Sequence, residues 1–161
     1  RQNDTDYWAI TVAYIHPREN ELYVADTAQK RGMTFSEGIR FIEQIAAQVE
    51  RPQVVVEAIA AQQYLVDELT SNGLNVTPVN TSRNKHEKLI DMSIPISNGT
   101  VQFIDWRENE TDPVPYQDLR DQMLGFPEAA HDDLLDSLAL VVNHAPTRTS
   151  IFGGSYKDGD L

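Results

Sequence analysis

The sequence predicts an α/β domain with a mixed sheet flanked by helices, and two observations carry this prediction. Two strand-like segments, 7–15 and 21–28, are separated only by the turn-forming residues 16–20, which indicates an antiparallel hairpin. Strand-like and helix-like segments then alternate along the chain, an order typical of parallel crossovers. An antiparallel start followed by parallel crossovers gives a mixed sheet.

The remaining elements follow from hydrophobic spacing and from turn residues. A helix is expected over 34–50, where apolar residues recur at helical spacing and Thr34 and Glu37 match a capping box. The apolar run 53–56 is typical of a strand buried on both faces. The further elements expected are helices over 60–71, from 85 to 92, over 116–123 and over 131–144, strands over 74–79 and 100–104, and a loop over 105–115.

Composition limits the possible functions. The chain has 161 residues, enough for one domain, and 13 Lys and Arg against 25 Asp and Glu give a formal net charge of -12. This balance weighs against a nucleic-acid partner, although a local basic stretch or a bound cation reverses the sign of one face. The absence of cysteine excludes disulfides, thiolate catalysis and cysteine-ligated metals. No apolar run is long enough to cross a bilayer, so no membrane partner is expected.

The strongest chemical signal is an acidic cluster at the start of the last predicted helix. Asp132 and Asp136 are four positions apart and Asp133 and Asp136 three, so each pair of carboxylates shares a helix face and repels. One interpretation is an N-terminal cap with stabilisation by the helix dipole, which explains Asp136 poorly because it lies a turn deeper. The other is a cation site. From the spacing alone the two interpretations weigh equally, and an oxygen-rich site favours magnesium, manganese or calcium.

Two further segments contain candidate site residues. Glu57 follows the buried strand 53–56, at the edge where open α/β sheets place ligands, although an exposed strand exit explains Glu57 taken alone. The densest basic stretch contains Arg83, Lys85 and Lys88, which suits contact with phosphate or a solvated helix start. A Gly-rich phosphate loop and a Gly-x-Ser-x-Gly elbow are both absent from the sequence.

Taken together, the motifs resemble the nuclease domain of phage terminase large subunits. The similar segments occur in the family's order, and they are residues 6–12, 55–62, 84–88 with 99–101, and 131–139. The resemblance implies an RNase H-like fold and metal-dependent cleavage of double-stranded DNA, with two Mg²⁺ or Mn²⁺ ions as cofactors. It also implies that the enzyme trims concatemeric DNA to a length that fills the capsid.

The resemblance implies a specific set of site residues. The middle acidic residue of the family falls on Glu57, and its last acidic cluster falls on Asp132, Asp133 and Asp136. The family's first metal-binding Asp lies on a strand several residues before Asp6, so we expect that this first strand is missing here. Asp6 matches a position that can supply an accessory carboxylate. Arg83, Lys85 and Lys88 are expected to contact the DNA backbone.

The expected context is that of a packaging motor. Residues 1–145 are expected to form the nuclease domain and 146–161 a C-terminal linker or tail, within a longer polypeptide because the chain lacks an initiator Met. The implied partners are double-stranded DNA, an ATPase domain of the same polypeptide, the terminase small subunit and the portal protein. The implied location is the host cytoplasm during virus assembly, or a prophage-bearing host. The alternatives are another RNase H-like nuclease, such as a Holliday-junction resolvase, and a non-catalytic module that docks on DNA or the portal.

Overall fold

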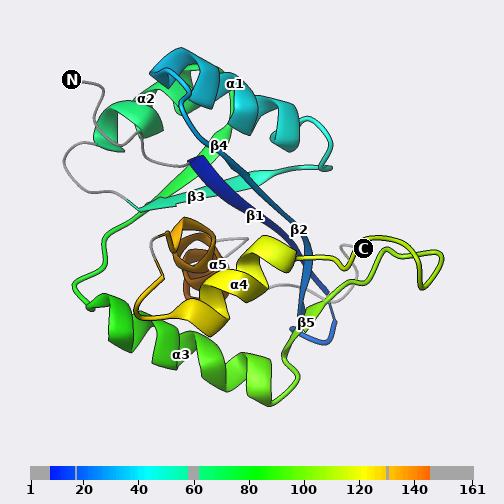
Figure 1. The fold of residues 1–161 in the computed structure, drawn as a ribbon. Coiled ribbons are helices and arrows are strands. Elements are labelled where there is room, and N and C mark those ends of the chain that lie inside the picture. The colour runs from blue at the N-terminus through cyan, green and yellow to red at the C-terminus, as the bar shows by residue number, and fades with distance from the viewer. Residues whose placement is uncertain (1–7, 17, 58–61, 130, 146–161) are drawn as a thin grey trace.

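The computed structural model describes residues 8–16, 18–57, 62–129 and 131–145. Within these residues the chain forms five strands and five helices (Figure 1). In chain order they are β1 (Trp8–Ile15), β2 (Leu22–Lys30), α1 (Phe35–Ala46), β3 (Gln53–Glu57), α2 (Gln63–Ser71), β4 (Asn75–Val79), α3 (Lys85–Ser97), β5 (Val101–Phe103), α4 (Gln117–Gly125) and α5 (Asp133–His144). None of the described helices is long and apolar enough to cross a bilayer.

The predicted mixed sheet is confirmed. β1 and β2 form the antiparallel hairpin, with Trp8 opposite Lys30 and Ile15 opposite Leu22. β5 adds to the other edge of β2 in parallel, giving the order β1-β2-β5. β3 and β4 pair in parallel with each other, and among the described residues no ladder joins this two-stranded sheet to the three-stranded one.

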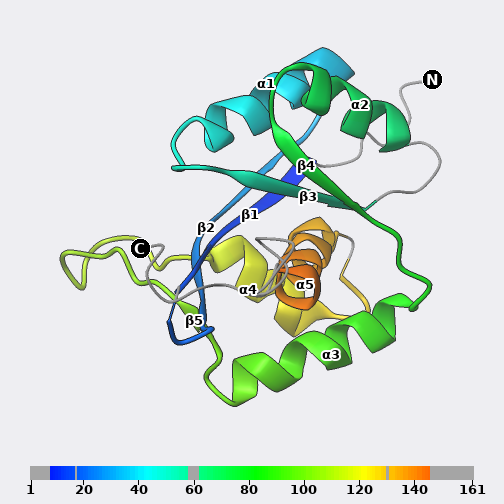
Figure 2. The same cartoon turned by 180° about the vertical axis from the view of Figure 1, so that it is seen from behind.

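Helices cover the strands on two sides, and each side has its own core. α1 and α2 lie on one side and α3, α4 and α5 on the other, as both views show (Figures 1 and 2). The larger core lies between the three-stranded sheet and α3, α4 and α5, and Val24, Leu134 and Leu138 are completely buried in it. The smaller core joins α1 and α2 to β3, with Leu69 completely buried. The hydrophobic core is therefore divided into two parts, just as the strands form two separate sheets in the described residues.

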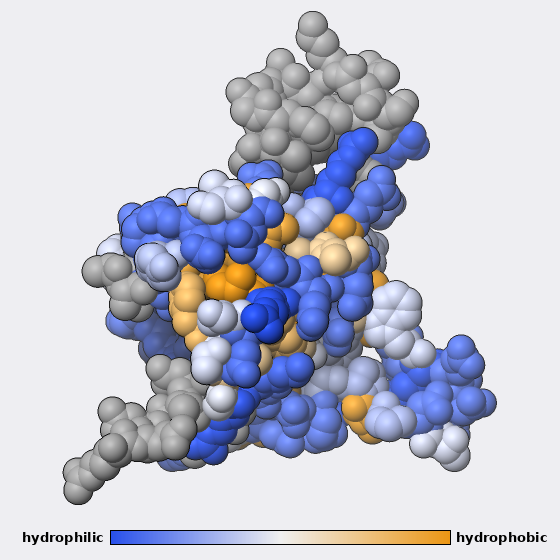
Figure 3. All heavy atoms as spheres, turned by 90° about the horizontal axis from the view of Figure 1, so that it is seen from above, coloured by the Kyte–Doolittle hydropathy of each residue, from blue (hydrophilic) through white to orange (hydrophobic). Residues whose placement is uncertain are grey.

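A close approach between helix and strand fixes α1 against the start of β1. Gly38 is buried in α1, and a Cβ atom at this position would overlap the Trp8 ring. Phe35, in the first turn of α1, packs edge-on against the same ring with 6.2 Å between centroids. The outward face over α1 and α2 is mainly hydrophilic, with an apolar area ringed by polar residues (Figure 3).

Two helices end well away from the predicted residue, while the other helix boundaries differ by three residues or fewer. The helix expected over 34–50 ends at Ala46, because the chain continues into turns and Arg51 adopts a left-handed conformation with φ of 50°. The helix predicted from 85 to 92 continues to Ser97 through Pro95. Pro95 lies so near the end of α3 that its missing N–H removes one hydrogen bond from the last turns without stopping the helix.

Candidate active site

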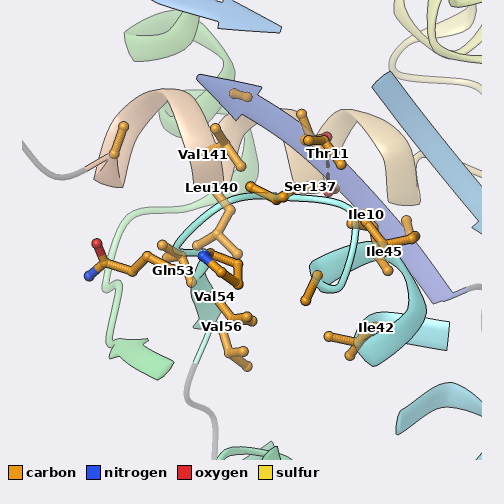
Figure 4. Close-up of a pocket in the computed structure, with 18 of the residues that line it drawn as sticks. Ile10, Thr11, Ile42, Ile45, Gln53, Val54, Val56, Ser137, Leu140 and Val141 are labelled. Carbon is orange, nitrogen blue, oxygen red and sulfur yellow. Dashed lines mark hydrogen bonds between the residues drawn. The ribbon is translucent and has the colours of Figure 1, made fainter. Parts of the chain in front are cut away.

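A cavity of about 850 Å³ separates β1 from β3. Both strands line it along their lengths, together with parts of α1 and α5. Figure 4 shows the apolar side chains of Ile10, Ile42, Val54 and Leu140 around this cavity, each from a different element. Within the described residues β1 has only β2 as a partner and β3 only β4, so two strand edges border the same space.

The predicted acidic residues reach this cavity from two distant parts of the chain. Glu57 is the last residue of β3, and Asp133 and Asp136 belong to the first turn of α5. All three line the cavity. A hydrogen bond of 3.0 Å from the Ser137 hydroxyl to the Thr11 hydroxyl ties α5 to β1, and Figure 4 draws it as a dashed line. The fold thus brings to one cavity the carboxylates that the sequence placed on separate elements.

Lys85 contacts two of the acidic side chains at once. Its Nζ donates a hydrogen bond to Oδ2 of Asp132 and lies 3.0 Å from Oδ2 of Asp136. Burial alone would lower the pKa of Lys85, but the hydrogen bonds to both carboxylates and their charges outweigh it and raise this pKa. Burial raises the pKa of Asp136, although the hydrogen bond and charge of Lys85 act in the opposite direction. The two aspartates therefore share one ammonium group.

Lys88, one turn further along α3, contacts the other acidic element, the end of β3. Its Nζ donates a hydrogen bond of 2.7 Å to Oε1 of Glu57. The backbone of α3 is fixed nearby, because the Asn143 amide donates a hydrogen bond of 3.1 Å to the Lys88 carbonyl oxygen. A complete capping box of Asn84 and Glu87 starts the helix at Lys85. The two lysines of the basic stretch thus lie against the acidic residues.

Gln122, which the sequence analysis did not single out, positions the acidic end of α5. Asp132 occupies the N-cap position of α5, but its side chain makes no capping hydrogen bond. Instead the Leu135 N–H donates to Oε1 of Gln122 at 3.1 Å, and Gln122 in turn donates to Oε1 of Gln29 at 3.3 Å. The capping interpretation of Asp132 is therefore wrong, and its carboxylate faces Lys85. One signal in the sequence was that Gln122 lies three positions after the apolar Leu119, which places both side chains on one face of the predicted helix.

The other predicted site residues have different positions. Among the contacts of the described residues, Arg83 pairs with Asp91 of α3 at 2.8 Å. Asp6 lies outside the described residues. In the part of the chain that the structure describes, no three Asp, Glu, His or Cys side chains converge closely enough to hold a metal ion. The described carboxylates offer oxygen atoms, the ligands that a hard divalent cation prefers. Among the described residues, however, fewer of these side chains converge than such an ion needs.

Comparison with known proteins identifies the family. The model of the terminase RNase H-like domain matches residues 2–145, most of the chain. The chain therefore belongs to the terminase RNase H-like domain family. A search of curated proteins found no match.

Two solved structures have the same fold. The large terminase nuclease from the thermophilic phage G20c with bound zinc is 19% identical, with a TM-score of 0.58 over 88% of this chain and 84% of that chain. The same nuclease with bound cobalt gives 16% identity and a TM-score of 0.53 over the same shares. At these identities the likeness shows the fold alone.

Proposed function

We propose that this domain is the nuclease domain of a phage terminase large subunit and that it cuts double-stranded DNA with two divalent ions, Mg²⁺ or Mn²⁺. One observation carries the proposal beyond the family assignment. In this fold Glu57 and the acidic end of α5 line one cavity, although the sequence separates them widely. The zinc and cobalt bound by the nuclease of similar fold support a role for divalent metal.

In this proposal the acidic residues hold the metal and the basic residues hold the DNA. The metal ligands are Glu57, Asp132, Asp133 and Asp136, with Asp6 as an accessory carboxylate. When bound, paired divalent ions activate a water molecule, neutralise the attacked phosphate and stabilise the leaving oxygen. Arg83, Lys85 and Lys88 contact phosphates of the DNA backbone, which places positive charge on one face of an acidic chain.

We assign the cavity between β1 and β3 to the first strand of the family's fold. Trp8, at the start of β1, contacts Phe35, and Phe35 contacts Tyr64 of α2, the helix after β3. Both views show the start of β1 closer to the end of β3 than to its beginning, with the two strands running in roughly opposite directions (Figures 1 and 2). A strand that precedes β1 through a short turn would run antiparallel to β1 and parallel to β3. Its last residues would lie near Glu57, where the first metal-binding Asp is needed.

The biological role proposed is the cutting of concatemeric DNA during genome packaging. Residues 1–145 would form the nuclease domain and 146–161 a linker or tail that lies outside the described residues. Its partners would be an ATPase domain in the same polypeptide, the terminase small subunit and the portal protein. Its location would be the host cytoplasm during virus assembly, including assembly from a prophage.

Cleavage assays with a chain extended upstream of Arg1 test this proposal. We expect nicking and linearisation of supercoiled plasmid in Mn²⁺ or Mg²⁺ and none in EDTA. A protein that binds DNA but leaves the plasmid intact in both metals would be the non-catalytic docking module instead. Cleavage of a four-way junction with no cleavage of linear duplex would identify a resolvase-type nuclease.

A further inference from the structure

We infer that Lys85 and Lys88, called the lysine pair below, act as internal counter-ions of the acidic site and compete with divalent metal for it. Metal binding then turns both ammonium groups toward the DNA. This inference rests on the proposed function, because it concerns the same carboxylates. It adds a coupling between metal binding and DNA binding that the proposed function alone does not require.

The contacts of the lysine pair carry the inference. Three of the proposed metal ligands already have a lysine cation at hydrogen-bond distance, with Lys85 on Asp132 and Asp136 and Lys88 on Glu57. A divalent ion bound by the same carboxylates would lie about 2 Å from their oxygens. Two cations that close to one carboxylate repel each other, so the metal must displace the ammonium groups.

The position of the lysine pair at the start of α3 also indicates that these lysines belong to the acidic site. Lys85 is the first residue of α3 and Lys88 lies within the next turn. Positive charge is unfavourable at this end of a helix, because the helix dipole is itself positive there. The acidic residues of β3 and α5 compensate this cost through contacts between elements. The favourable energy of the lysine pair at this place therefore comes from the acidic site.

The lysine pair can leave the site without movement of the helix. The side chains are partly exposed, 39% for Lys85 and 25% for Lys88, so solvent reaches both. The backbone is held by the capping box of Asn84 and Glu87 and by the Asn143 hydrogen bond. Each ammonium group ends a flexible four-carbon stem, which can reorient about a fixed backbone.

The consequence is a reciprocal coupling between two ligands. Metal that occupies the carboxylates releases two positive charges at the entrance of the site, where they are available to phosphate. By thermodynamic linkage, DNA that engages the lysine pair strengthens metal binding by the same factor.

Titration calorimetry with Mn²⁺, in the same upstream-extended chain as the cleavage assays, tests the competition without any cleavage. The variants are Lys85→Met and Lys88→Met, which keep an unbranched stem and remove the charge. Arg83→Gln is the matched control, because it removes the same charge near the start of α3 from a residue that pairs with Asp91. We expect each lysine variant to bind Mn²⁺ more tightly, on the order of fivefold, and the control to match the parent.

The outcomes separate the inference from the proposed function. Mn²⁺ binding that is equal or weaker in both lysine variants, with a parent that binds, overturns the inference and leaves the metal site intact. Equal tightening in Arg83→Gln also overturns it, because long-range charge would then be the cause. No Mn²⁺ binding in any of the four proteins overturns both the inference and the metal site. Lys85→Met and Lys88→Met each test the inference separately. If one of them fails to fold, the Mn²⁺ affinity of the other still decides the outcome.

Discussion

Lys88 of α3 donates a hydrogen bond of 2.7 Å to Glu57 at the end of β3, which joins two elements that belong to different cores. Two of the three proposed DNA contacts are thus paired with proposed metal ligands. Under the proposed function, this arrangement reconciles a net charge of -12 with a polyanionic substrate. The two lysines that contact the acidic site candidates are both held on α3.

The first prediction concerns DNA binding by the lysine pair. In the presence of metal, the double variant Lys85→Ala, Lys88→Ala should weaken DNA binding equally for all sequences. Each lost phosphate contact should lower the slope of log affinity against log salt concentration by about 0.9. Fluorescence anisotropy of a labelled duplex at several salt concentrations measures this slope. Lys30→Ala, which removes a lysine that lies over the Phe41 ring, should keep the parent slope. An unchanged slope in the double variant would show that the lysine pair does not contact phosphate.

The second prediction concerns the buried amide that caps α5. Gln122→Leu should lower the free energy of unfolding by about 1–3 kcal/mol, because it leaves the Leu135 N–H buried without an acceptor. Urea unfolding followed by circular dichroism measures the change. Gln117→Leu is the control, since Gln117 is exposed on the same helix and bonds only to nearby Asp121 in the described contacts. Equal stability of the two variants would contradict the assigned role of Gln122.

The third prediction concerns the contact between α1 and β1. Gly38→Ala should destabilise the protein by about 1–3 kcal/mol or more, because the new methyl group overlaps the Trp8 ring. In an open helix the same change would stabilise by about 0.5–1 kcal/mol, so the sign of the effect identifies the cause. Thermal unfolding of Gly38→Ala beside Gln44→Ala, an exposed position of α1, provides the comparison. A higher melting temperature for Gly38→Ala would show that Trp8 does not pack against this helix.

Much of the fold could be predicted because its signals are local. Two strand-like segments separated by turn-forming residues predicted the hairpin, and the capping-box pattern at Thr34 and Glu37 predicted the start of α1 at its observed residue. The separation of β3 and β4 from the other strands could not be predicted, since strand pairing depends on contacts far apart in sequence. The end of α3 was also missed, because the helix continues through Pro95 to Ser97, beyond the residue predicted from the local sequence.

The site could be predicted only in part. The acidic candidates were noticeable because Asp136 lies a turn deeper than a helix cap and shares a helix face with Asp132 and Asp133, and as metal ligands they stay a prediction. Their partners were not recognisable, because the pairing of Lys85 with Asp132 joins positions 47 residues apart. Gln122 was missed for the same reason, since its acceptor role depends on how α4 packs against α5.

The fourth prediction concerns stability in the presence of metal. Millimolar Mg²⁺ or Mn²⁺ should raise the melting temperature above that in EDTA, because ligand that binds only the native state stabilises it. The gain is about 2.7 kcal/mol at a hundredfold excess over Kd, or roughly 2–4 °C for each kcal/mol in a chain of this size. Scanning fluorimetry in EDTA, Mg²⁺ and Mn²⁺ measures it. Identical midpoints in all three buffers would count strongly against a metal site.

The most direct test of the account is nicking of supercoiled plasmid by Asp133→Asn in Mn²⁺, in a chain extended upstream of Arg1. Asp133 is in the first turn of α5 and lines the cavity with Glu57. A neutral amide is a poor ligand for a divalent ion in a two-ion site, so cleavage should be abolished. Stability should stay equal or rise by a few tenths of a kcal/mol, since the repulsion from Asp136 is removed. Asp118→Asn, in the first turn of α4, makes the same change and should cut as the parent does. Undiminished nicking by Asp133→Asn would remove Asp133 from the site and contradict the assignment.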